Sequence, residues 1–116
     1  MKTTTINKTT YYTPSMWNKR SRIFKDTWRE GQEFQNASGN MRVYKTKDGK
    51  TYLYSYNTLV IEVFPDGWGR CFGTYSTTTR RHISQFFRDF FPKLNYYAAK
   101  ESAETGIIFN TVTGQY

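Results

Sequence analysis

Metal-binding and redox-active side chains are scarce in this sequence. It contains one cysteine and one histidine, whereas a zinc site needs three or four sulfur or nitrogen ligands. A single cysteine cannot form an internal disulfide, which favours a reducing cytosol. The chain also lacks a glycine-rich phosphate-binding loop and a pattern of paired carboxylates. We therefore expect no metal or other cofactor, and nothing in the sequence points to an enzyme.

Long apolar segments are missing as well. No run reaches the length of about 18 apolar residues that a transmembrane helix needs. The N-terminal residues, MKTTTINKTT, lack the apolar region of a signal peptide. Hydrophobic residues make up 37% of the chain, but aromatic residues alone reach 19%. Because each ring buries a large area, we expect a core built mainly from aromatic side chains.

Length and charge together predict one basic domain. A chain of 116 residues fits a single domain, which we expect over residues 21–116, after a basic, threonine-rich arm over 1–20. The net charge is +8, and residues 1–31 hold seven Lys or Arg against two Asp or Glu, a surplus of +5. Such a surplus favours an anionic partner, such as nucleic acid, an anionic membrane surface or an acidic protein.

Residues 51–64, TYLYSYNTLVIEVF, are expected to form the central strand, because they are the densest run of β-branched and aromatic residues. The large residues change parity at Asn57, from Tyr52, Tyr54 and Tyr56 to Leu59, Ile61 and Val63. Side chains alternate faces along a strand, so a β-bulge at Asn57 would bring all six onto one face. We predict that this face is the core and that Tyr54 and Ile61 share it.

Two Asp-Gly pairs, Asp48-Gly49 and Asp66-Gly67, predict hairpins on either side of this strand. A two-residue loop at the first would align Val43, in a strand over 41–47, with Tyr54. A two-residue loop at the second would set Phe72, in a strand over 69–75, beside Ile61 and leave Cys71 on the opposite face. The glycines at 67 and 69 also allow a wider second turn.

Helical periodicity is clearest after residue 76. The apolar positions i, i+3, i+4, i+7 and i+8 hold Ile83, Phe86, Phe87, Phe90 and Phe91. We predict a helix that is capped by one of Thr77–Thr79, stopped by Pro92, and packed over the tyrosine face. A short helix over 21–31, a weaker one over 93–103 that ends at Gly106, and a final strand over 107–112 complete the prediction. The fold class is therefore α+β, a small antiparallel sheet with a bulged central strand, covered on one face by the Phe-rich helix.

The first candidate binding site is Arg80-Arg81-His82 at the start of the Phe-rich helix, with Arg88 two turns further on. A basic helix N-terminus suits an anion, because backbone N–H groups and guanidinium groups converge there. The alternative is that Arg80 and Arg81 only form ion pairs with Glu101, Glu104 or Asp89. His82 and Cys71 could in principle form a base and a nucleophile, but a cysteine inside a strand is usually inert.

A second basic cluster lies near the N-terminus and is interleaved with Trp17, Phe24 and Trp28; it comprises Lys19, Arg20, Arg22, Lys25 and Arg29. Basic residues with stacking rings can hold single-stranded nucleic acid. The alternative is a short amphipathic helix whose rings pack on the core. The tyrosines of residues 52–56 allow the same two interpretations, base stacking or core packing, and the need to cover the Phe-rich helix favours the core.

Three short motifs occur in the stretch from the central strand to the Phe-rich helix. Tyr54–Thr58 reads Tyr-Ser-Tyr-x-Thr, Tyr75–Thr79 reads Tyr-Ser-x-Thr-Thr, and Arg81–Phe86 continues with Arg-His-Ile and a phenylalanine. Together they resemble a recurring core of small uncharacterised bacteriophage proteins, over roughly a third of the chain. The resemblance implies a viral accessory protein made in the bacterial host cytoplasm. Phage proteins of this size often disarm host defence, and anti-CRISPR proteins are among them.

We therefore expect a non-enzymatic phage accessory protein that binds nucleic acid or a nucleoprotein, such as a CRISPR effector complex, through its basic surface. Mimicry of DNA, which requires an acidic protein, is excluded by the net charge of +8. The alternative is a protein–protein interaction module that binds an acidic host protein surface without nucleic acid. A structural virion component is disfavoured because no self-assembling repeat is present. No membrane partner is expected, and the oligomeric state is not predicted.

Overall fold

The computed structural model describes residues 3–6, 9–12, 22–25, 30–36 and 39–116. Strands β1 (Thr3–Ile6) and β2 (Thr9–Tyr12) pair with each other in a small sheet of their own. The main sheet is antiparallel, in the order β3-β4-β5-β6-β7-β8-β9. Its strands are β3 (Arg22–Lys25), β4 (Glu30–Gln35), β5 (Met41–Thr46), β6 (Thr51–Ser55), β7 (Thr58–Val63), β8 (Trp68–Cys71) and β9 (Phe109–Asn110).

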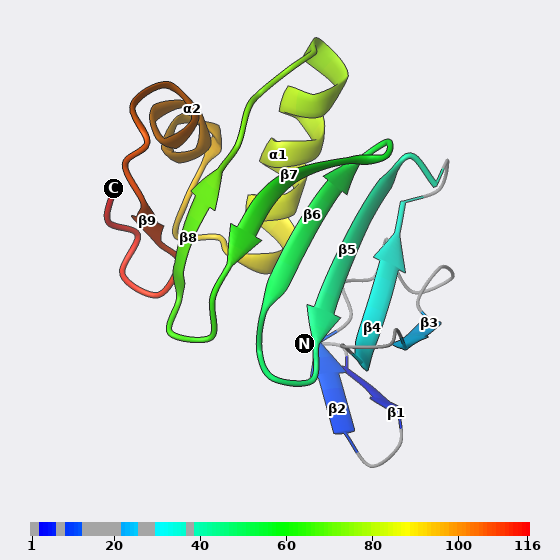
Figure 1. The fold of residues 1–116 in the computed structure, drawn as a ribbon. Helices are drawn as coiled ribbons and strands as arrows, with labels where there is room; N and C mark the ends of the chain where they lie inside the picture. Colours follow the sequence, from blue (N-terminus) through cyan, green and yellow to red (C-terminus); the bar gives the residue numbers. More distant parts are fainter. Residues whose placement is uncertain (1–2, 7–8, 13–21, 26–29, 37–38) are drawn as a thin grey trace.

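Two helices follow β8 and lie on one face of this sheet (Figure 1). Helix α1 (Thr77–Phe90) packs on the middle of the sheet, and α2 (Tyr96–Thr105) packs on β8 and β9. We call the covered face the inner face and the opposite one the outer face. The predicted α+β class, with a Phe-rich helix over an antiparallel sheet, is confirmed. No helix among the residues described is long and apolar enough to cross a membrane.

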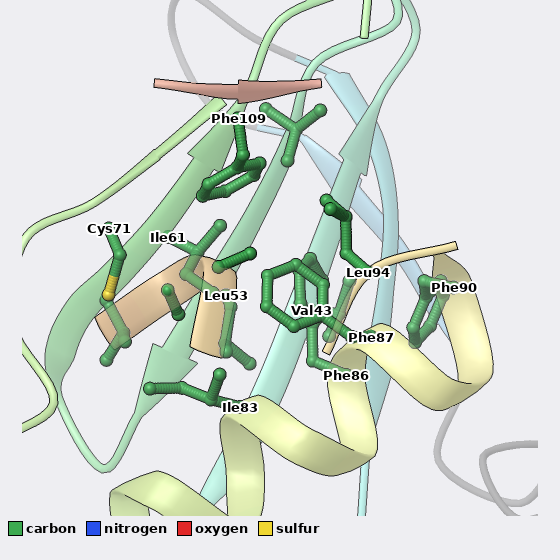
Figure 2. Packing of buried hydrophobic residues seen from close by; sticks show 14 of the residues in the cluster. Val43, Leu53, Ile61, Cys71, Ile83, Phe86, Phe87, Phe90, Leu94 and Phe109 are labelled. Atoms are coloured by element: carbon green, nitrogen blue, oxygen red, sulfur yellow. The ribbon is translucent and has the colours of Figure 1, made fainter. Parts of the chain in front are cut away.

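The core lies between α1 and the inner face (Figure 2). Ile83, Phe86 and Phe87 have no exposed surface, and Phe90 is also buried. The Phe87 ring meets Phe109 edge-on, with 5.5 Å between the ring centroids. On the sheet side the buried residues include Val43, Leu53, Ile61 and Cys71. The apolar stripe predicted for α1 is therefore the centre of the core.

The long central strand is instead a hairpin. Strands β6 and β7 are joined by a tight turn at Tyr56-Asn57, in which Tyr56 has a left-handed φ of 57°. The β6–β7 pair does carry an irregularity, but it lies at Val60. Leu53 pairs with Ile61 and Tyr54 with Leu59, so Val60 is the extra residue. The change of parity at Asn57 marks a turn, because a turn interrupts the alternation just as a bulge does.

Both Asp-Gly hairpins have three-residue loops. At the first, Thr46 N donates to Lys50 O at 2.9 Å, and Gly49 has a φ of 98°. At the second, Phe64 N donates to Trp68 O at 2.8 Å, and Gly67 has a φ of 95°. A type I turn followed by a left-handed glycine is the usual geometry of such a loop. One additional loop residue shifts the strand pairing by one position and reverses which side chains face the core.

This shift overturns the predicted tyrosine face. Val43 pairs with Leu53, and both are buried on the inner face, so Tyr54 lies on the outer one. The prediction that Tyr54 and Ile61 share the core face is therefore wrong. Cys71, rather than Phe72, pairs with Ile61 and faces the core. The wider second turn that Gly67 and Gly69 allowed is the one adopted.

Of the remaining elements, one is of the wrong type and the others differ from their predictions at their ends. The helix expected over 21–31 is wrong, because 22–25 and 30–35 are strands and β4 pairs with β5. Helix α1 is capped by Ser76, which accepts a hydrogen bond from Thr79 N at 3.2 Å, rather than by a threonine. Helix α2 starts at Tyr96, three residues later than predicted, and is ended by left-handed Gly106, as predicted. The final strand is confined to Phe109–Asn110.

Candidate functional site

An open groove of about 620 Å³ lies between the exposed side of α1 and the first turn of α2. Its lining includes Arg80, Arg81 and Arg88 from α1, and Tyr96 and Tyr97 from α2. We call it the arginine groove. Residues of an α-helix that are three, four or seven positions apart lie on one side, so Arg81 and Arg88 share a side with Ser84. The structure thus brings together three of the four site residues predicted on α1.

Among the residues described, two of the three arginines that line the groove have no carboxylate partner. Arg88 Nε lies 3.3 Å from Asp89 Oδ1, and Lys100 Nζ lies 3.6 Å from Glu104 Oε1. Among the residues described, no carboxylate lies within 4.0 Å of Arg80 or Arg81. The described part of the chain therefore does not show the alternative, in which Arg80 and Arg81 only form ion pairs with nearby acidic residues.

The opposite wall of the groove is aromatic. Asn95 caps α2 by accepting a hydrogen bond from Tyr97 N at 3.0 Å. The Tyr96 ring packs partly against the core, and the Tyr97 ring meets it edge-on at a centroid distance of 5.8 Å. The Tyr97 side chain itself remains exposed. A second hollow of about 390 Å³ shares Tyr96 and Tyr97 with the groove and continues it to Pro92.

His82 does not belong to the groove. It is buried on the inner side of α1, where its Nδ1 lies 2.8 Å from Ser55 Oγ on β6. The same hydroxyl lies 3.0 Å from Thr79 Oγ1. Burial lowers the pKa of His82 below its ordinary value, because the charged imidazolium loses its hydration. The predicted group Arg80-Arg81-His82 is therefore divided, with the arginines outside and the histidine bound to the sheet.

Cys71 and His82 do not form the pair that was considered as a nucleophile and its base. The Cys71 Sγ lies 3.4 Å from Gly73 O, and its backbone N donates to Ser102 Oγ at 2.9 Å. Burial raises the pKa of the Cys71 thiol to about 11, so the thiol is protonated at neutral pH and is a poor nucleophile. The Nδ1 of His82 is paired with Ser55 instead.

The second basic cluster lies largely outside the described residues. Lys19, Arg20 and Arg29 are not among the described residues. Arg22 and Lys25 are on β3, which forms one edge of the main sheet, whereas α2 packs on β8 and β9 at the other edge. The backbone of β3 is therefore remote from the tyrosine wall of the groove. Within the described residues, Arg22 and Lys25 therefore lie on a different element from the arginines and tyrosines of the groove.

Sequence reasoning missed the two tyrosines of the groove. A helix over 93–103, as the sequence predicts it, puts Tyr97 on one side with Leu94 and Ala98. In the structure Ala98 and Ala99 are buried and Tyr97 is exposed. A signal was available, because Asn95 is a favourable N-cap and the small pair Ala98-Ala99 suits close packing on a sheet. A helix that begins at Tyr96 and buries both alanines directs Tyr97 outwards.

Comparison with known proteins gives one match. A model described as "Family of unknown function (DUF8033)" matches residues 27–108. This span contains strands β4 to β8, both helices and all the residues named in the arginine groove. No curated protein and no solved structure matches the chain.

Proposed function

The chain belongs to the DUF8033 family, a family of unknown function, and from its own surface we propose that it binds nucleic acid, free or within a nucleoprotein, through the arginine groove. The observation that carries the proposal is the pair Arg80 and Arg81, exposed beside a tyrosine wall and without a carboxylate within 4.0 Å among the residues described. An anionic ligand would supply the missing partner.

Arginine chemistry fits the phosphate backbone. The guanidinium group is planar, always charged, and able to donate two parallel hydrogen bonds to a phosphate. Arg80 and Arg81 lie close to the N-terminus of α1, where the helix dipole adds a partial positive charge. The net charge of +8 would attract a polyanion from a distance as well. The open groove suits an extended chain better than an enclosed small molecule.

The biological setting follows from the sequence resemblance to small bacteriophage proteins. We propose that the protein acts in the cytoplasm of a bacterial host as a non-enzymatic accessory protein. Inhibition of host defence, with a CRISPR effector complex as the nucleoprotein partner, is the role that we favour. A basic groove would then compete for guide RNA or target DNA, which are the polyanions such a complex exposes.

A salt titration of nucleic-acid binding tests the groove directly. The logarithm of the binding constant should fall linearly with the logarithm of the salt concentration, because bound cations are released from the phosphates. Arg80→Gln/Arg81→Gln should weaken binding and reduce the slope by about 1.4–1.8 if each arginine contacts one phosphate. Fluorescence anisotropy with a labelled oligonucleotide measures both quantities.

The matched control is Lys47→Gln/Lys50→Gln, which removes the same charge from the β5–β6 loop. This loop and the start of α1 lie at opposite ends of the molecule (Figure 1). The control should retain most of the affinity. Equal losses in the two double variants would mean that net charge, and not the groove, holds the nucleic acid.

A protein-binding module is the second candidate. On the outer face, Phe64 and Trp68 flank the β7–β8 turn and Phe72 follows β8, and all three are exposed. Exposed aromatic residues are common anchors of protein interfaces. In this case the chain would bind an acidic host protein without nucleic acid. Purification of the tagged protein from a bacterial host, with and without nuclease, separates the two candidates. A partner that persists after nuclease treatment, combined with no oligonucleotide binding at physiological salt, favours the module.

A further inference from the structure

Tyr97 combines two properties that rarely occur together, exposure and a fixed position. Its side chain belongs to a residue that is 65% exposed. Its backbone N–H is held by the Asn95 cap at 3.0 Å. Its ring makes an edge-on contact with Tyr96, which is itself packed against the core. One consequence is that the ring offers a free face to a ligand in the groove without losing much conformational freedom on binding.

In the groove the Tyr97 ring lies across from positively charged side chains. Arg80 and Arg81 stand on the α1 wall and Tyr97 on the α2 wall of the same hollow. Beyond them the hollow continues past Arg88 to the apolar surface of Pro92 and Leu94. A ligand lying along the groove would therefore meet guanidinium groups on one side and an aromatic and apolar surface on the other. A nucleotide strand, with phosphates along one edge and bases along the other, matches this division.

From this arrangement we infer that the ligand is a single-stranded nucleic acid and that one of its bases stacks on the Tyr97 ring. The inference rests on the proposed function and adds a strand preference to it. In a duplex both faces of each internal base are covered by its neighbours, so a protein ring cannot stack on them. In a single strand the bases can be splayed out, and stacking on aromatic side chains is how such strands are commonly bound.

The test compares a labelled single strand of about 12 nucleotides, a length within the usual site sizes, with the duplex of the same sequence. The wild-type chain should bind the single strand more tightly. Tyr97→Ala should weaken single-strand binding by about 5- to 150-fold and weaken duplex binding by much less. Tyr97→Phe keeps the ring and should bind as the wild type does. Tyr116→Ala removes an exposed tyrosine outside the groove lining and is the control.

The possible outcomes separate this inference from the proposed function. Equal binding of single strand and duplex by the wild type would overturn the strand preference, and no loss in Tyr97→Ala would overturn the stacking on Tyr97; in both cases nucleic-acid binding stands. A loss in Tyr97→Phe as large as in Tyr97→Ala would assign the contact to the hydroxyl group and overturn stacking. Binding of neither ligand at physiological salt would contradict the proposed function, and the inference with it. Circular dichroism of each variant verifies that it remains folded.

Discussion

The two sides of helix α1 differ in almost every property. The inner side carries Ile83, Phe86 and Phe87, which have no exposed surface, and His82, which is bound to Ser55 of the sheet. The outer side carries the arginines of the groove, which are exposed. Because neighbouring residues of a helix point about 100° apart, one segment serves both purposes. The comparison implies that stability and binding can be changed separately by substitutions in this helix.

The largest effect is expected on the inner side. Phe87→Ala should lower the free energy of unfolding by about 3–5 kcal/mol, because it leaves a cavity under a fully buried ring. Phe87 also loses its edge contact with Phe109. Urea denaturation measures the change. Phe72→Ala, at an exposed ring, should cost less than about 1 kcal/mol. A similar small cost for Phe87→Ala would show that α1 does not pack on the sheet as described.

Charge reversal on the outer side of α1 should change binding and leave stability largely unaffected. Arg80→Glu/Arg81→Glu should weaken nucleic-acid binding by about 100-fold or more, because attraction to phosphate becomes repulsion. Its stability should be unchanged or higher by up to about 1 kcal/mol, since acidic residues near a helix N-terminus interact well with the dipole. Anisotropy and urea denaturation on the same samples give both values. Wild-type affinity in this variant would exclude the groove as the binding site.

Because His82 lies on the inner side of α1, its titration should make the stability of the fold depend on pH. Its pKa is lowered by burial, so the unfolded chain binds more protons than the folded one as the pH falls. Stability should therefore be complete above about pH 6.5, the ordinary pKa of histidine, and decline as the pH drops below it. Urea denaturation between pH 8 and pH 5 tests this expectation.

The control for this experiment is His82→Asn, which keeps a polar group near Ser55 but does not titrate. The variant should be less stable at neutral pH, since the contact at 2.8 Å between His82 Nδ1 and Ser55 Oγ is altered. Its stability should be flat over the pH range in which the wild type declines. An equally steep decline in the variant would mean that another group is responsible.

The difference between the sides of α1 could be predicted because its pattern is local. The spacing of Ile83, Phe86, Phe87 and Phe90 fits a helical period, and Pro92 sets its limit. The exposed positions of Arg80 and Arg81 follow from the same period. That neither arginine has a carboxylate partner within the described part of the chain does not follow from the period, because it depends on where α2 places Glu104 and on which cation Glu104 meets.

The faces of the sheet could not be predicted in the same way. Asp48-Gly49 correctly indicates a hairpin, but the same pair fits loops of two or three residues. The choice of three residues reversed the face of every side chain in β6, which turned Tyr54 from a predicted core residue into one on the outer face. Residues 30–35 pair with β5 and residues 22–25 pair with 30–35, and this sheet pairing overrides the local helical pattern.

The smallest effect on nucleic-acid binding is expected from substitutions in the second basic cluster. Lys19→Glu/Arg20→Glu/Arg22→Glu should weaken nucleic-acid binding by less than Arg80→Glu/Arg81→Glu and lower its salt dependence, without abolishing it. The reason is that Arg80 and Arg81 stand on a helix packed into the core, beside a positioned ring, and β3 lies at the far edge of the sheet. If this triple variant loses all binding and the arginine variant none, the N-terminal region is the binding element and the groove is ordinary surface.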